Sequence, residues 1–229
     1  MAQFDGLTLD VLDLGGQAAF WRTALGGGML RQENALQLRI DRIPERPDAE
    51  ILRLHQVESL PPDDARVHVD LRLPGQRPTE LIAAGVAVIR RPGADPWYVL
   101  ADPEGNEFCA FPATDDRPPG IFELVVKCES ARDLAHWWSV VLGGRVDYEG
   151  EAVSVTGSPG FPWDYMVFDP VPDPRPSRNR VHWHVQLRDE SPADLLAHGA
   201  RLLAGPESDA DGWLLADPEG NRFHARATG

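Results

Sequence analysis

The pattern of apolar and polar positions in the second half of the chain changes from one period to another. Side chains of Glu123–Cys128 alternate in the manner of a β-strand, with Leu124, Val126 and Cys128 on one face. Apolar residues then recur at helical spacing, at Leu134, Trp137, Trp138, Val141 and Leu142. Ser130 and Asp133 resemble a capping box at the start of this segment, and Gly143 is suited to end it. The pattern therefore predicts a strand followed by a helix.

The same alternation of strands and helices runs through the rest of the chain. Strand patterns follow the first predicted helix at 152–155 and 165–169. A second cycle has a helix at 192–198 and strands at 181–187, 201–203, 212–216 and 222–226. The first half has the same order, with helices near 17–25 and 78–84. These patterns predict an α+β protein made of four βαβββ units, two in each half.

A long internal repeat supports this division. Leu100–Asn106 and Leu215–Asn221 share the sequence Leu-Ala-Asp-Pro-Glu-Gly-Asn, and Arg66-Val-His68 returns as Arg180-Val-His182. Two copies of this length indicate a duplicated domain rather than a solenoid. We place the two domains at 1–113 and 118–229, joined by a proline-rich linker.

The repeated Asp-Pro-Glu-Gly-Asn segment has the composition of a tight turn. Proline presets its own φ angle and glycine tolerates a positive one, so the segment suits the connection of a hairpin. This gives both copies a structural role. We expect their glutamates, Glu104 and Glu219, to point into water.

Net charge and cysteine content argue against some classes of partner and of cellular location. A formal net charge of −14 argues against nucleic acids and anionic membranes as partners. The two cysteines, Cys109 and Cys128, are too few for a disulfide framework, and no segment has the pattern of a signal peptide or a membrane span. We therefore expect a cytoplasmic protein that acts on a small-molecule substrate or ligand.

The repeated turns, the Trp137-Trp138 helix before Leu142-Gly-Gly144 and the Arg-Val-His strands together resemble the vicinal-oxygen-chelate superfamily, which includes glyoxalases, bleomycin-resistance proteins and dioxygenases. The resemblance covers essentially the whole chain. It implies two tandem glyoxalase-like domains, each with two βαβββ units that form a cupped, open mixed sheet with helices outside. Because lyases, isomerases, dioxygenases and simple binding proteins share this scaffold, it implies the fold more strongly than the reaction.

The resemblance also implies a metal site. Its ligand positions, seven residues before a strand-to-helix boundary and three after the turn asparagine, correspond here to Glu123, His182 and His224. Two imidazoles and a carboxylate suit Zn, Ni, Mn or Fe as divalent ions. The usual order is changed, because glutamate comes first and histidine last. The first half has Gly6, His68 and Cys109 at these positions, so we expect its cup to be degenerate, with His68 structural.

Strand alternation places further candidates around this expected C-terminal site. His184 and Gln186 share a face with His182, and Arg222 shares one with His224. We assign proton transfer to His184, because an imidazole titrates near neutral pH, and name Tyr165 as a weaker candidate for the same role. The residues expected to bind substrate are Trp163, Arg222 and Gln186.

Two functions remain open on this evidence. The first is a metal-dependent lyase or isomerase that acts on a small oxygen-rich substrate in the C-terminal cup. The alternative is a metal-free protein that sequesters a drug or another small molecule. Internal duplication favours a monomer that imitates a dimer, with a homodimer as the other possibility. Exchange of units between the halves also stays open, and it would bring first-half residues such as His68 into the site.

Overall fold

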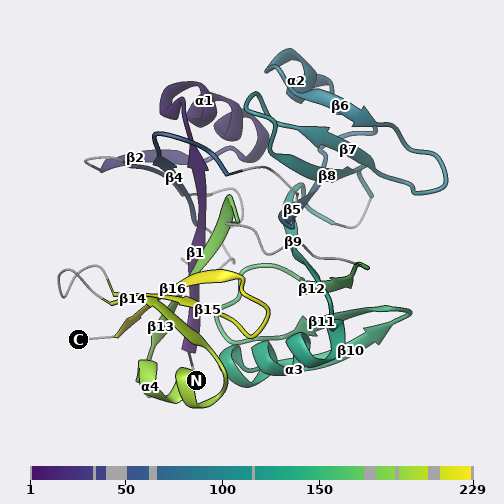
Figure 1. Cartoon of the computed structure of the whole chain (residues 1–229). Coiled ribbons are helices and arrows are strands. Elements are labelled where there is room, and N and C mark those ends of the chain that lie inside the picture. Colours follow the sequence, from purple (N-terminus) through teal and green to yellow (C-terminus); the bar gives the residue numbers. More distant parts are fainter. Residues whose placement is uncertain are drawn as a thin grey trace.

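The computed structural model describes residues 2–32, 35–39, 51–61, 66–114, 117–172, 179–188, 191–205 and 212–227. Within these ranges the chain forms the four predicted βαβββ units (Figure 1). The first unit contains β1 (Ala2–Val11), α1 (Leu14–Leu25), β2 (Gly28–Gln32), β3 (Ala35–Arg39) and β4 (Ile51–Gln56). The second contains β5 (Val67–Arg72), α2 (Thr79–Ala83), β6 (Ala87–Arg90), β7 (Tyr98–Ala101) and β8 (Glu107–Phe111).

The second half repeats this order. The third unit contains β9 (Gly120–Cys128), α3 (Ala131–Leu142), β10 (Arg145–Glu149), β11 (Ala152–Thr156) and β12 (Tyr165–Pro170). The fourth contains β13 (Val181–Leu187), α4 (Pro192–Ala197), β14 (Arg201–Ala204), β15 (Trp213–Ala216) and β16 (Arg222–Ala227). Residues 115 and 116 of the expected linker lie outside the described residues.

Each sheet combines units from both halves of the chain. The first sheet has the strand order β14-β15-β16-β13-β1-β4-β3-β2, and the second has β10-β11-β12-β9-β5-β8-β7-β6. At the centre of the first sheet β1 pairs antiparallel with β13, with Thr8 opposite His182. In the second sheet β5 pairs antiparallel with β9, with Asp70 opposite Glu123. Of the two pairings that the sequence leaves open, the chain therefore adopts the exchange between halves, and neither half forms a sheet by itself.

Apolar packing, in contrast, joins the two units of the same half. Helix α1 packs Trp21 against Phe108 of β8, with ring centroids 5.4 Å apart. Helix α3 packs Trp138 against Trp183 of β13 and Phe223 of β16, at 5.1 Å in both cases. Accordingly α1 and α2 lie at one end of the molecule and α3 and α4 at the other (Figure 1). These three tryptophans are buried, and complete burial of a large apolar side chain contributes roughly 1.5–3 kcal/mol.

Glu104 forms a clasp between the two sheets, which corrects the expectation that it points into water. The turn after β7 places its carboxylate on the backbone N–H groups of Leu12 and Asp13, between β1 and α1. Arg180, beside β13, donates to Glu104 Oε2 at 2.8 Å and to the Asp10 carbonyl at 3.0 Å. The turn of the second sheet is thus fixed to two strands of the first. We call this arrangement the Glu104 clasp.

The second copy of the turn forms an equivalent clasp. Glu219 accepts hydrogen bonds from the N–H groups of Glu129 and Ser130 at the start of α3, and Arg66 donates to its carbonyl and its carboxylate. Ser130 donates its hydroxyl to Asp133, so the expected capping box is not formed and Glu219 supplies the N-terminal acceptor instead. In each clasp the arginine of an Arg-Val-His motif therefore contacts the glutamate of an Asp-Pro-Glu-Gly-Asn motif, which explains why the two motifs recur together.

The helices of this fold are short. None in the described part of the chain combines the length and the apolar character needed to cross a bilayer.

Candidate functional site

The structure separates the ligand set expected from the sequence. His182 and His224 lie on β13 and β16 of the first sheet, whereas Glu123 lies on β9 of the second. The expected catalytic pair is divided in the same way. His184 is on β13 of the first sheet, whereas Tyr165 is on β12 of the second, opposite Glu123 of β9. The correction follows from the exchange of units, since strands of one half enter two different sheets.

Four histidines gather on one face of the first sheet, and we call them the histidine cluster: His55, His182, His184 and His224. His184 and His224 are stacked with ring centroids 4.7 Å apart, and His182 lies 5.2 Å from His224. Thr8 Oγ1 is 2.7 Å from His184 Nε2, and His55 Nδ1 is 3.1 Å from Asp10 Oδ1. Among the described residues, buried His182 Nδ1 has no hydrogen-bond partner.

Burial disfavours a positive charge on His182, His184 and His224. It lowers the pKa of His182 to about 3 and that of His224 to about 4, and it lowers the pKa of His184 well below the usual 6.5. Neighbouring histidines and Arg222 act in the same direction, because each would repel a new positive charge. His184 is therefore poorly suited to proton transfer near neutral pH.

We predict a pH-dependent contribution of the histidine cluster to stability. The folded-state pKa values lie below the unfolded value of 6.5, so the unfolded chain binds more protons as the pH falls from about 6.5 to about 4. The separate contributions of His182 and His224 should each fall by about 1.4 kcal/mol per pH unit in this window and stay constant above it. Urea unfolding of the wild type and of His182→Gln and His224→Gln, measured between pH 7 and 4.5, tests the difference in slope.

Variants are needed for this test because Glu123, in the second sheet, makes the free energy of unfolding change with pH in the opposite direction. Burial raises the pKa of Glu123 to about 7, so folding takes up a proton there and acid stabilises the fold between about pH 7 and 4.5. The wild-type curve sums both effects. A His182→Gln curve parallel to the wild type would contradict the prediction.

The residues expected to bind substrate are also redistributed. Gln186 and Arg222 stay near the histidine cluster, on β13 and β16. Trp163 is buried edge-on against Phe4 and Phe161, with ring centroids 5.3 and 5.4 Å away, and belongs to apolar packing. Its assignment to substrate binding is therefore corrected, because its ring is covered by protein.

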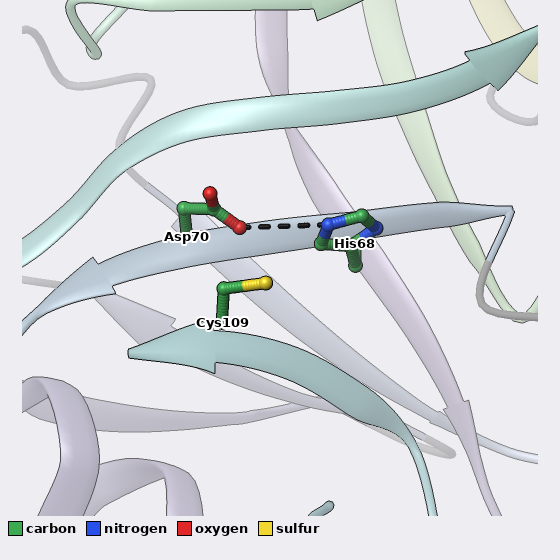
Figure 2. Close-up of side chains that lie close together, drawn as sticks. All are labelled: His68, Asp70 and Cys109. Carbon is green, nitrogen blue, oxygen red and sulfur yellow. Dashed lines mark ion pairs between the residues drawn. The ribbon is translucent and has the colours of Figure 1, made fainter. Parts of the chain in front are cut away.

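A cavity of about 590 Å³ lies in the second sheet, and we call it the acidic cavity. Its carboxyl groups are Asp70, Glu107, Glu123, Glu149 and Asp169. His68, Asp70 and Cys109 also line it, and each offers one ligand atom within 4.8 Å of the other two (Figure 2). We call these three the His-Asp-Cys group, the one set in the described part of the chain with this spacing. It combines adjacent strands, because His68 and Asp70 project from β5 and Cys109 from β8.

The surroundings of this group favour the neutral forms of its carboxyl and thiol groups. His68 Nε2 lies 3.5 Å from Asp70 Oδ1, and that buried oxygen has no hydrogen-bond partner among the described residues. Burial raises the pKa of Asp70, and the neighbouring Glu123 carboxylate raises it further. Burial and Asp70 together raise the pKa of the Cys109 thiol. A bound cation would oppose both shifts, because it favours the ionised forms of the carboxyl and thiol groups.

The donor chemistry also fits a divalent metal. Imidazole, carboxylate and thiolate are the ligands of Zn²⁺, and three protein ligands leave coordination positions open for substrate. Thiolate favours the softer first-row ions over Mg²⁺ or Mn²⁺. Since Asp70 Oδ1 accepts no hydrogen bond from the described residues and the three ligand atoms are close together, the residues present fit such an ion.

Two further hollows share lining residues with one another. A groove of about 700 Å³ is lined by Arg117, Arg145 and Tyr165, and a smaller space of about 230 Å³ is lined by Tyr165 and Glu123. Glu123 also lines the acidic cavity. Tyr165 and Glu123 are therefore neighbours at the wall of one of these hollows.

Sequence reasoning missed Asp70 as a candidate, set Cys109 aside, and brought His68 into the site only for the case of exchanged units. His68 and Cys109 occupy the ligand positions of their unit, but Gly6 at the third position made the first half look degenerate. The exchange of units supplies Glu123 in place of Gly6. The spacing that marks His68 and Cys109 as ligand positions was visible in the sequence. It indicates a complete site only when the second unit is paired with the third.

The fold and the arrangement of the sheets define a tandem vicinal-oxygen-chelate protein. The chain belongs to the Glyoxalase-like domain family, whose model matches residues 6–111 and 123–225. Glyoxalase I from Zea mays is similar in structure, with a TM-score of 0.68, 12% identity, and coverage of 98% of this chain and 92% of that one. A putative dioxygenase from Bacillus subtilis has a TM-score of 0.65, 14% identity, and coverage of 98% and 84%.

At these identities the structural similarities show the fold alone. A comparison with curated proteins gives no match.

Proposed function

We propose that the chain is a divalent-metal-dependent lyase or isomerase of the glyoxalase-like type, with its site in the acidic cavity. The observation that carries the proposal is the His-Asp-Cys group, whose three ligand atoms lie within 4.8 Å of one another. This site replaces the C-terminal one expected from the sequence and keeps Glu123 from that set. The substrate class stays a small molecule with vicinal oxygens.

In this proposal His68, Asp70 and Cys109 hold the ion. When bound, the ion supplies Lewis-acid polarisation of two neighbouring substrate oxygens and stabilises negative charge on them. Asp70 has a second role, because its register opposite Glu123 orients that carboxyl group toward the same space. The donor set leads us to expect Zn²⁺ as the preferred ion.

Glu123 is the proton acceptor in this scheme. It is not one of the three proposed ligands, yet it lies opposite Asp70 on the neighbouring strand, so its carboxylate stays available to accept a proton. Glu123 lines the acidic cavity and also the smaller space lined by Tyr165. Glu123 would remove a proton from the carbon beside the polarised carbonyl, and Tyr165 would contact the incoming substrate.

Metal content tests the location of the site. Protein purified without chelators and incubated with Zn²⁺ should retain about one ion per chain after gel filtration. His68→Ala and Cys109→Ser should weaken retention at least about tenfold, because each removes a ligand. His182→Ala is the matched control in the first sheet and should retain the ion. Loss of metal in His182→Ala together with retention in His68→Ala would move the site to the histidine cluster.

Proton exchange tests the reaction class. Hydroxyacetone is a small probe with vicinal oxygens, and NMR in D₂O follows exchange of its carbon-bound protons. The loaded protein should accelerate the exchange, and Glu123→Gln should slow it about a hundredfold while retaining the metal. Exchange at the wild-type rate in Glu123→Gln would remove Glu123 from the proposed role.

Metal-free sequestration is the second candidate, and the lining of the acidic cavity favours it. Asp70 and Glu123 can share a proton without an ion, and burial keeps the Cys109 thiol protonated. The cavity would then bind a ligand without changing it. A wild-type protein that retains no metal after loading supports this function over the enzyme.

A further inference from the structure

A pocket of about 270 Å³ is lined by residues of α1, of α2 and of the end of β5, and we call it the helix pocket. Among the described residues it shares no lining side chain with the acidic cavity, so it is a separate space. Pockets for drug-sized ligands usually measure about 300–1,000 Å³. The helix pocket therefore suits a smaller molecule.

The apolar part of the helix pocket comes from three different elements. Leu71 and Leu73 line it from the end of β5, Leu81 lines it from α2, and Ala24 lines it from α1. The three leucines also belong to the buried core, so their positions are fixed by packing on their other sides. A short aliphatic group that enters is transferred from water to this surface, which favours its binding.

The charged part of the helix pocket offers one cation and one anion. Arg77 and Glu80 line it with exposed side chains, and neither forms an ion pair within the described part of the chain. Arg72 also lines the pocket, but its guanidinium bonds to Asp164 at 3.0 Å and lies 4.0 Å from the Phe122 ring centroid. A ligand that carries both charges would pair with Arg77 and Glu80 at once, whereas a singly charged ligand would pair with one of them and be repelled by the other.

We propose that the helix pocket binds a small zwitterion with an apolar side chain, which is the chemistry of an aliphatic α-amino acid. Arg77 would pair with its carboxylate and Glu80 with its ammonium group. The side chain would pack on the leucines of the pocket. The inference goes beyond the proposed function, because it concerns a second site whose ligand needs no metal.

Strand β5 connects the helix pocket with the acidic cavity. Asp70 of β5 lines the acidic cavity, and the next residue, Leu71, lines the helix pocket. The register of β5 against β9 shifts between these two residues, since Asp70 lies opposite Glu123 and Leu71 opposite Ile121. Irregularities of this kind bend a strand and are frequent beside active sites. A ligand that contacts Leu71 would change the placement of Asp70 across one peptide bond, and so act as an effector of the acidic cavity.

Three probes with the same branched aliphatic group test the chemistry of the ligand. L-leucine carries both charges, 4-methylpentanoate carries only the negative charge, and 3-methylbutylamine carries only the positive one. Calorimetric titration of the metal-free protein at neutral pH should give L-leucine at least about threefold tighter binding than either of the others, because an exposed ion pair contributes modestly. Equal affinity for the three probes, or binding of none, would overturn the proposed ligand class.

Two exposed charges can be removed one at a time to locate the binding. Arg77→Gln should lower the affinity for L-leucine to that for 3-methylbutylamine, and Glu80→Gln should lower it to that for 4-methylpentanoate. Arg91→Gln is the matched control, because Arg91 is an exposed arginine directly after β6 and does not line the pocket. It should leave all three affinities unchanged. L-leucine binding at the wild-type level in both pocket variants would refute the helix pocket as the site.

Amide resonances in NMR spectra test the connection to the acidic cavity. Saturation with L-leucine should shift the backbone amide resonances of Asp70 and Glu123, and unchanged resonances at both would overturn the effector role. In metal-loaded protein the two ligands should change each other's affinity by the same factor. L-leucine binding by a protein that retains no metal would refute the proposed enzyme alone. Metal retention without L-leucine binding would refute this inference alone.

Discussion

A fragment of residues 1–113, produced alone, is expected to have no folded monomer. Its two half-sheets would end at β1 and β5, which in the full chain are central strands bonded to β13 and β9. Each lost backbone hydrogen bond contributes about 1 kcal/mol net, and the exposed edges would accept any suitable strand. The apolar contact of Trp21 with Phe108 stays within the fragment, so we expect an associating species rather than a random coil.

A mixture of the two fragments provides the control for this experiment. The fragment 118–229 should behave in the same way alone, and an equimolar mixture of the two should form a one-to-one complex with the circular dichroism spectrum of the full chain. Sedimentation velocity distinguishes monomer, self-associated fragment and complex. A stable folded monomer of either fragment would show that the exchange of units between halves is not needed for folding.

The sequence predicts the elements of this fold well because their signals are local. Helix α3 has apolar residues at helical spacing and glycine at its end, and Gly143 indeed takes a φ of 74° there. In β13 the alternation correctly places His182 and His184 on one face, beside His224, and Trp183 on the other, against Trp138, although all of these strand residues are buried except His224, which is half-buried. Such patterns depend only on residues that are close together in the chain.

The pairing of units could not be predicted because no local signal encodes it. The alternation in β1 determines which face is buried, but it does not determine whether the bonded neighbour is β5 or β13. The candidate site depends entirely on this choice, since Glu123 meets Asp70 only across the bond between β5 and β9. Trp163 illustrates a second gap, because only the tertiary structure brings Phe4 beside it.

Replacement of Arg180 by alanine is expected to destabilise the protein by about 3–5 kcal/mol. The guanidinium is almost completely buried and serves three acceptors, namely the Asp10 carbonyl, the Glu104 carbonyl and the Glu104 carboxylate. Alanine would leave the Glu104 carboxylate largely buried without its cation. Urea unfolding at neutral pH measures the loss, and Arg180→Lys should lose less, because it keeps the charge but not the planar set of donors.

Arg145→Ala is the control, because Arg145 pairs with Asp147 at the surface with most of its side chain exposed, and its removal should not change stability measurably. The double variant Arg180→Ala/Glu104→Ala should lose clearly less than the sum of the two single variants, since each single change already breaks the Glu104 clasp. Strict additivity would mean that the two side chains act independently and that the repeated motifs do not hold the sheets together. Non-additivity would explain why arginine and glutamate recur together in both halves: each clasp joins a turn of one sheet to strands of the other, and so fixes the pairing that also builds the acidic cavity.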